Sequence, residues 1–309
     1  MKRYVFHTSG VCPPEIHLAV RGQTLERVRF VGGGCAGQAR LTAKLLAGRP
    51  LAEVRRLARG VPCRNGTSCP DQLARAIGQL AAGRLPLALP VKRLVKPRPC
   101  IAVVAHAEGR AGLLARAADK ARALGAREVV LLGDAAAPGQ PAAANREALE
   151  VIKAHKIIAL RGPGDQAVLE AGGLSARQAR TLAAMPVQLV CRVGETLLTA
   201  FHGGHLLDLP GYSVAGPFGL EVMAVAELSL YLEDEDVLPA LEALAPEMRA
   251  RAVVFAHTRR WKRVKLGGVD FINVGPLAAR SRAGRPRLEL ALLSAGRRGL
   301  RLARRGWAA

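Results

Sequence analysis

The feature that most constrains this chain is a segment rich in proline and basic residues, LPLALPVKRLVKPRP, at residues 85–99. Each proline fixes its own φ and lacks an N–H donor, so prolines at this density interrupt a helical or strand period. We therefore expect a linker at residues 86–99 between a first domain, residues 1–85, and a second, residues 100–309. Half of the 309 residues are hydrophobic, so each part is long enough to bury a core of its own.

The net charge of +22 is concentrated at the two ends of the chain. Residues 1–98 carry 18 Lys and Arg against 4 Asp and Glu, and residues 249–309 carry 16 against 2, whereas residues 99–248 carry 12 against 18. Basic surfaces attract the phosphates of nucleotides and nucleic acids, which indicates a partner of that kind. The alternative explanation is a biased base composition, because Arg and Ala are abundant throughout the chain.

The sequence shows neither a membrane span nor a secretion signal. No window approaches the roughly 18 uninterrupted apolar residues that a spanning helix needs, and the N-terminal MKRYVFHTSG lacks the apolar stretch of a signal peptide. These patterns predict a cytoplasmic protein with no membrane partner. Thiols stay reduced in the cytoplasm, so the six cysteines are expected to bind metal or take part in chemistry before they form disulfides.

The first domain is predicted to be a small α+β module. Residues 15–20 and 24–31 show the partial alternation of two strands around a turn. Helical stretches follow at about residues 37–47, 51–59 and 71–82.

Four cysteines of this module lie in turns or beside glycines, where the backbone can converge on one point: Cys12, Cys35, Cys63 and Cys69. Four thiolates from loops are the ligand set of a structural zinc site, which is tetrahedral with bonds of about 2.3 Å. The spacing does not follow the common paired pattern, so two alternatives stay open. The cysteines can be small buried residues, or redox-active thiols whose pKa is lowered by a neighbour such as Arg64.

The sequence around the cysteines resembles the TSCPD domain over residues 4–83. The matching stretches are FHTSGVCPPEI, VRFVGGGCAGQARL, LLAGRPLAEVRRLARGVPC and GTSCPDQLARAI, the last of which holds the run that names the family. This module is the C-terminal part of cobalamin-dependent class II ribonucleoside-diphosphate reductases and also a small free-standing protein. The resemblance implies a reductase-associated module that binds metal, nucleotide or nucleic acid. It does not imply reductase catalysis, because residues 1–90 are too short for the reductase barrel.

The second domain is predicted to be an α/β sheet with helices on its faces. Apolar runs at residues 101–105, 129–132 and 157–160 are typical of buried strands, and a helical stretch lies at about residues 111–124. Further apolar runs extend the sheet: residues 187–193, 196–201, 253–255 and 271–274. The remaining cysteines, Cys100 and Cys191, lie in such runs and are expected in the core.

The polar residues after these strands resemble the motifs of calcineurin-like metallophosphoesterases, in particular the compact bacterial phosphodiesterases. That family places Asp-x-His-Gly after its first strand, Gly-Asp after the second and Gly-Asn-His-Asp after the third, followed by His-Gly and then by Gly-His-Thr-His before a closing Asn-Pro-Gly-Ser turn. The corresponding stretches here are VVAHAEGR, LLGDAAAPG, ALRGPGDQ, HGGH and FAHTRR, before INVGPLAARSR. The resemblance implies a β-sandwich with flanking helices.

Residues that can bind a metal survive at the matching positions: His106, Glu108, Asp134, His202 and His257, with His205 as a further candidate. Phosphoesterases of this kind hold two ions about 3.5 to 4 Å apart, and Asp134 matches the bridging carboxylate. Pro163 and Gly164 replace an Asn and a His, and Arg259 replaces the last His. Proline offers no side-chain ligand, and a guanidinium repels metal but attracts phosphate. We therefore expect at most one weakly bound ion or none; manganese or another divalent ion belongs to the alternative in which this domain is an active phosphodiesterase.

The sequence thus predicts an accessory protein that binds nucleotide or nucleic acid and is linked to ribonucleotide reduction and hence to DNA synthesis, with zinc in its first domain. In this reading the phosphoesterase-like domain has lost most of its catalytic ligands, and Arg259 and Arg64 are candidate phosphate ligands. A ribonucleotide reductase is the candidate protein partner. The alternative is a divergent metal-dependent phosphodiesterase, and a weaker alternative is a component of the reductase itself.

Overall fold

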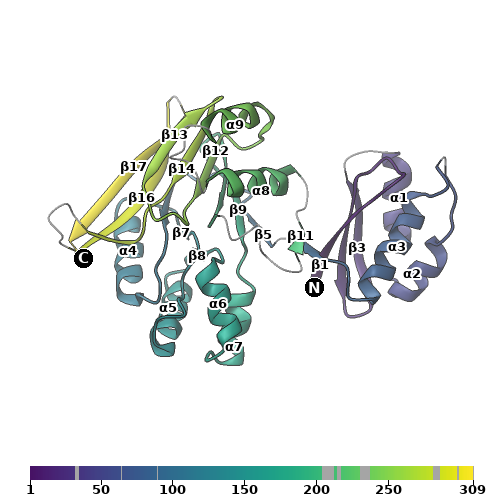
Figure 1. The fold of residues 1–309 in the computed structure, drawn as a ribbon, viewed down its shortest axis with the longest axis horizontal. Coiled ribbons are helices and arrows are strands. Elements are labelled where there is room, and N and C mark those ends of the chain that lie inside the picture. The colour runs from purple at the N-terminus through teal and green to yellow at the C-terminus, as the bar shows by residue number, and fades with distance from the viewer. Residues whose placement is uncertain are drawn as a thin grey trace. The chain divides into compact units, whose positions relative to one another are not determined.

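The computed structural model describes residues 1–31, 35–63, 65–88, 90–203, 212–213, 217–229, 237–280, 286–297 and 299–308. The chain divides into two compact units, drawn together in Figure 1. Unit 1 comprises Met1–Leu89 with Leu209–Leu220, and unit 2 comprises Pro90–Asp208 with Glu221–Ala309.

Unit 1 is a sheet with three helices on one face (Figure 1). Its antiparallel strands are β1 (Lys2–His7), β2 (Glu15–Arg21) and β3 (Thr24–Val31), and its helices are α1 (Ala36–Leu46), α2 (Leu51–Ala58) and α3 (Cys69–Ala81). Alternate strand residues such as Ile16, Leu18 and Val28 pack against Val54 and Leu73 of the helices. The two predicted strands and three predicted helices are confirmed to within two residues, whereas β1 was not predicted.

The segment expected as a linker, residues 86–99, contains the boundary between the two units and contributes a strand to each. Strand β4 (Leu87–Ala88) pairs with β1 and with β11 (Tyr212–Ser213) in unit 1. Strand β5 (Val91–Arg93) pairs with a strand of unit 2 and forms the edge of its sheet. The prolines lie at strand ends and beside an edge, where a missing N–H costs no ladder hydrogen bond.

Unit 2 contains two mixed sheets. One has the strand order β15-β16-β6-β7-β8, with β17 paired to β16, and the other has the order β13-β14-β12-β10-β9-β5. The first sheet is built from β6 (Cys100–Val104), β7 (Glu128–Leu131), β8 (Ile158–Ala159), β15 (Ala278–Arg280), β16 (Pro286–Gly296) and β17 (Gly299–Ala308). The second adds to β5 the strands β9 (Gln188–Val193), β10 (Thr196–Phe201), β12 (Ala252–Phe255), β13 (Lys262–Leu266) and β14 (Val269–Asn273).

The two sheets of unit 2 pack face to face through an apolar layer that includes Val103, Leu189 and Val254. A second apolar layer, with Ala102 and Leu114, joins the first sheet to helices on its other face. The helices on that side are α4 (Ala111–Ala123), α5 (Ala142–Ala154), α6 (Pro163–Ala171) and α7 (Ala176–Ala183), and α8 (Pro217–Ser229) and α9 (Val237–Leu244) lie beside the second sheet (Figure 1). The predicted β-sandwich with flanking helices is therefore confirmed. Within the described residues, no helix is long and apolar enough to cross a membrane.

Candidate functional site

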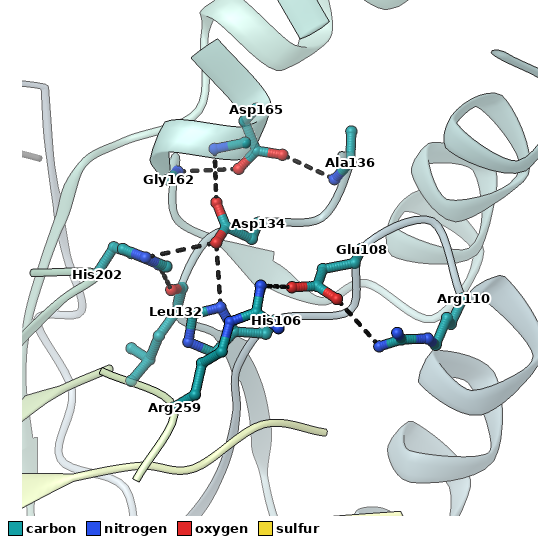
Figure 2. A network of polar contacts seen from close by, with 11 residues as sticks. His106, Glu108, Arg110, Leu132, Asp134, Ala136, Gly162, Asp165, His202 and Arg259 are labelled. Carbon is teal, nitrogen blue, oxygen red and sulfur yellow. Dashed lines mark hydrogen bonds and ion pairs between the residues drawn. The ribbon is translucent and has the colours of Figure 1, made fainter. Parts of the chain in front are cut away.

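The candidate site lies where strands of both sheets in unit 2 end (Figure 2). Loops that follow the carboxyl ends of strands are where open α/β sheets usually bind ligands. The contributions are His106 and Glu108 after β6, Asp134 after β7, His202 after β10, and His257 and Arg259 after β12.

Backbone hydrogen bonds hold these loops side by side beyond the strand ends. The N–H of Glu108 donates to the carbonyl of Asp134 at 2.7 Å, and the N–H of Ala256 donates to the carbonyl of His202 at 2.8 Å. The side chains that follow β6 and β7, and those that follow β10 and β12, are thus brought together as pairs.

Backbone strain is concentrated at this site. Six non-glycine residues described in unit 2 have positive φ, and five of them are site residues: His106 (57°), Glu108 (51°), Asp134 (53°), His257 (72°) and Arg259 (60°). A left-handed conformation costs an L-residue roughly 1–2 kcal/mol. Such strain persists where surrounding structure enforces it, and it clusters at functional sites.

Asp134 is the centre of the polar network (Figure 2). Its Oδ2 lies 3.0 Å from Nδ1 of His106 and 3.5 Å from Nε2 of His202, and its Oδ1 accepts the N–H of Gly164 at 2.8 Å. Burial by itself raises the pKa of Asp134, but the hydrogen bond from His106, the charge of His202 and the Gly164 N–H outweigh it and hold the pKa at about 2. Asp134 is therefore an ionised carboxylate at neutral pH.

The ring nitrogens around Asp134 are arranged for a cation. Nδ1 of His202 donates to the carbonyl of Leu132 at 2.6 Å, so in the neutral ring the lone pair of Nε2 faces Asp134. Nε2 of His106 is buried and has no hydrogen-bond partner in the part of the chain that the structure describes. One ligand atom each from His106, Asp134 and His202 lies within 4.8 Å of the other two. All three residues are buried.

The carboxylate of Glu108 is paired with two arginines of this chain. Its Oε1 accepts a hydrogen bond from Nη2 of Arg259, and its Oε2 lies 3.1 Å from Nη1 of Arg110 (Figure 2). The carboxylate is thus an ion-pair partner and not an open metal ligand. Arg110 was not identified from the sequence, because one Arg among 37 carries no distinguishing signal.

His257 lies beside the cluster, with its ring 5.4 Å from that of His202 in an edge-to-face arrangement. Burial, followed by the charges of His106 and Arg259, lowers the pKa of His257, against the opposing effect of Asp134. A neutral imidazole is the form that binds metal. His205 and Arg64 lie outside the described residues.

Asp165 supports the site and was also missed. Its carboxylate accepts the N–H of Ala136 at 2.9 Å and the N–H of Gly162 at 2.9 Å. Burial raises its pKa to about 7, against the lowering effect of these hydrogen bonds. The available signal was its place in the GPGD stretch, three residues after the glycine that precedes helix α6.

The four cysteines of unit 1 lie on loops and helix starts. Cys12 lies between β1 and β2, Cys35 immediately precedes α1, Cys63 lies between α2 and α3, and Cys69 begins α3. The pKa of Cys69 is raised by burial and then by the neighbouring thiolates of Cys12, Cys63 and Cys35. The first three are exposed and Cys69 is half-buried. The zinc site on these thiols stays a prediction.

The other two cysteines, Cys100 and Cys191, are buried in the apolar layers of unit 2. Burial raises the pKa of both thiols, that of Cys191 to about 12. They are core residues, as the apolar runs around them indicate.

Comparisons with known proteins give one family match and several similar solved structures. Residues 2–81 match the family model described as TSCPD domain. No curated protein matches the chain. Among solved structures, a predicted phosphoesterase from Streptococcus pneumoniae TIGR4 is 15% identical, with a TM-score of 0.39, and covers 70% of this chain and 100% of its own.

Two further structures are similar at the same level. A novel archaeal phosphodiesterase is 11% identical, with a TM-score of 0.41, and covers 67% of this chain and 99% of its own. Vacuolar protein sorting 29 from Cryptosporidium parvum is 15% identical, with a TM-score of 0.34, and covers 69% of this chain and 100% of its own. The family match concerns residues 2–81, which lie in unit 1 and are similar to the TSCPD domain.

Proposed function

We propose that unit 2 binds one divalent metal ion on His106, Asp134 and His202, and that the ion and Arg259 together bind the phosphate group of a nucleotide or nucleic acid. The observation that carries this proposal is the mutual approach of the three ligand atoms within 4.8 Å. The chain is then a phosphate-binding accessory protein and not a two-metal hydrolase.

The donor set fits a single transition-metal ion. Two imidazoles and a carboxylate bind zinc or manganese at about 2.0–2.2 Å, which places tetrahedral ligands roughly 3.4 Å apart. The 3.5 Å separation between Nε2 of His202 and Oδ2 of Asp134 is close to that value. Nδ1 of His106, 3.0 Å from the same oxygen, would give up its proton and its hydrogen bond to Asp134 when the ion binds. The hydrogen bond from Nδ1 of His202 to the Leu132 carbonyl fixes the ring tautomer. Metal-binding histidines commonly donate their other ring N–H to a carbonyl or carboxylate in this way. Such an ion would supply a Lewis acid that attracts a phosphate oxygen.

Arg259 supplies the second positive group. Glu108 fixes one side of its guanidinium, yet the side chain of Arg259 is still 57% exposed. A guanidinium has five N–H donors, so those not used on Glu108 are available for phosphate oxygens. The same pairing occupies Glu108, which removes a ligand from any second metal ion.

The test measures metal content and phosphate affinity on the same samples of full chain. The His202→Ala variant should lose one equivalent of metal, while the His155→Ala control, outside the site and paired with Asp119, should keep it. The Arg259→Gln variant should keep the metal but bind a nucleoside monophosphate roughly tenfold more weakly, the loss of one charge-assisted contact. Unchanged metal content in His202→Ala, or unchanged affinity in Arg259→Gln, would contradict the proposal.

A second candidate function is metal-dependent hydrolysis of phosphodiesters. It is favoured by the positive φ values at five site residues, because enforced strain is typical of catalytic sites. Manganese should then stimulate hydrolysis of bis(4-nitrophenyl) phosphate by the wild type and not by Asp134→Ala. Equal rates for the two proteins would exclude this candidate.

For unit 1, we propose a zinc ion on Cys12, Cys35, Cys63 and Cys69 and a role beside a ribonucleotide reductase. The influence of the other three thiolates on the pKa of Cys69 supports their proximity. A hydrogen bond from Nδ2 of Asn65 to the Gly10 carbonyl at 3.2 Å also brings the loop of Cys63 to that of Cys12. The reductase link rests on the TSCPD match. Size-exclusion chromatography of the chain with a purified class II reductase would test it, and separate elution would contradict it.

A further inference from the structure

The sheet of unit 1 has a basic face opposite its helices. Inward residues such as Leu18 and Val28 pack into the core, so their neighbours in sequence point to the other face. Three exposed arginines point there: Arg3 on β1, and Arg27 and Arg29 on β3. We call these three residues the arginine face.

The strand register gives the spacing of this face. Arg3 is paired with Ala19 of β2, and Ala19 is paired with Arg27 of β3, so the three form one row across the sheet. Two strand spacings separate Arg3 from Arg27 by about 10 Å, and two residues along β3 separate Arg27 from Arg29 by about 7 Å. Ala19 lies between Arg3 and Arg27 in this row, and its side chain is too short to separate the two arginines.

One carboxylate, that of Glu15 on β2, points to the same face, but it is buried and lies 2.6 Å from Nε2 of His17. Arg3, Arg27 and Arg29 have no ion-pair partner among the described residues. Elsewhere in unit 1, three arginines are paired with carboxylates: Arg21 with Glu26, Arg49 with Glu53, and Arg75 with Asp71. An unpaired cluster of like charge attracts anions, and guanidinium groups suit phosphate in particular.

We propose that the arginine face binds the phosphate backbone of single-stranded nucleic acid without regard to sequence. The spacing of the three cations matches successive phosphates of one flexible strand. Their span of about 10 Å is shorter than the major groove of a duplex, about 12 Å, whose two phosphate banks they would have to reach. The outward residues of β1, β2 and β3 include no Phe, Tyr or Trp on which bases could stack, so the contacts are with the backbone.

The test uses the full chain and fluorescence anisotropy with a labelled 20-nucleotide oligo-dT at several salt concentrations. Three phosphate contacts account for a slope of about −2 in log affinity against log salt for a single strand. The triple variant Arg3→Gln, Arg27→Gln and Arg29→Gln should lose that slope and bind roughly tenfold more weakly near 0.1 M salt. The charge-matched control Arg40→Gln, Lys44→Gln and Arg56→Gln, exposed on the helical side, should change affinity less than threefold.

Three outcomes would overturn the proposal: no binding by the wild type, equal losses in the two triple variants, or tighter binding of a duplex of the same length through the same arginines. Circular dichroism melting of both triple variants checks that they fold alike. The proposal is independent of the metal centre in unit 2, because the metal content and the monophosphate affinity of the triple variant should equal those of the wild type.

Discussion

Gly162 shows how closely the backbone is packed at the metal centre. A Cβ at this position would lie 2.5 Å from Oδ1 of Asp134 and 2.6 Å from its backbone nitrogen. We predict that Gly162→Ala displaces Asp134, abolishes metal binding and lowers the free energy of unfolding by roughly 1–3 kcal/mol, as overpacking does. Thermal melting and metal analysis measure both effects. The control is Gly139→Ala, where no atom lies within 4 Å, and equal behaviour of the two variants would contradict the prediction.

Asp71 shows that part of the TSCPD run is structural. Its carboxylate accepts the N–H of Gly60 at 2.9 Å and the hydroxyl of Thr67 at 2.8 Å, while the hydroxyl of Ser68 accepts the N–H of Asp71 and caps helix α3. The Gly60 N–H, then Thr67, lower the pKa of Asp71 from its ordinary 3.8. A lowered pKa stabilises the folded state above pH 3.8, and that contribution is lost as the pH falls through the folded-state value.

We therefore predict that Asp71→Asn lowers the free energy of unfolding by about 1–3 kcal/mol at pH 7, the cost of a buried hydrogen-bond network left incomplete. The difference from the wild type should shrink below pH 4. Chemical denaturation at pH 7, 5 and 3 measures it. A difference that stays constant with pH would show that the charge of Asp71 does not matter.

The candidate site could be predicted in part from single residues. The resemblance of the motifs after the apolar runs to those of metallophosphoesterases pointed to His106, Asp134 and His202, and the structure brings these three residues together. The ion pair of Glu108 with Arg259 joins residues 151 apart in sequence, and no local pattern encodes it. The sequence therefore assigned Glu108 as a metal ligand, whereas its carboxylate is held by two guanidinium groups.

At the scale of elements, apolar runs predicted the fully buried strands, whereas the central strand β16, its partner β17 and the short strands β4 and β5 were not predicted. Strands such as β6 and β12 consist entirely of buried residues, so their sequences alone mark them. Strands β4 and β5 have two and three residues between prolines, and their hydrogen bonds come from β1 and β9. These segments form strands because they pair with β1 and β9, and their local sequences do not predict it.

A buried carboxylate joins the last hairpin to the loop before β13. Glu289 of β16 is 2% exposed and accepts hydrogen bonds from Arg304 of β17 and, at 2.7 Å, from the indole of Trp261. Removal of the Glu289 carboxylate leaves the Trp261 N–H without its acceptor, which costs about 1–3 kcal/mol, whereas the Arg304 side chain is 52% exposed and stays in contact with water. We predict that Glu289→Ala lowers the free energy of unfolding by that amount, as measured by denaturant unfolding. The control is Glu195→Ala, at an exposed turn, where the carboxylate has no partner among the described residues. A similar small loss in both variants would contradict the prediction.

At the scale of the whole molecule, two separate units carry two separate candidate metal centres. The chain crosses between the units near residues 89–90, 208–209 and 220–221, yet the cysteines belong to unit 1 and the His106, Asp134 and His202 cluster to unit 2. The thiolate set is typical of structural zinc, and the mixed nitrogen and oxygen set accepts zinc or manganese. Ligands that differ in type and lie in separate cores should lose their ions independently.

We predict two metal equivalents per chain when the protein is purified under reducing conditions and loaded with zinc and manganese. Cys63→Ser should remove one equivalent of zinc and leave the ion of unit 2, and Asp134→Ala should do the reverse. Elemental analysis of the two variants measures this directly, with Cys191→Ser as a control for a cysteine buried outside unit 1. Loss of both ions in either variant would show that the centres depend on each other, and unchanged zinc in Cys63→Ser would show that unit 1 does not use its cysteines to bind metal.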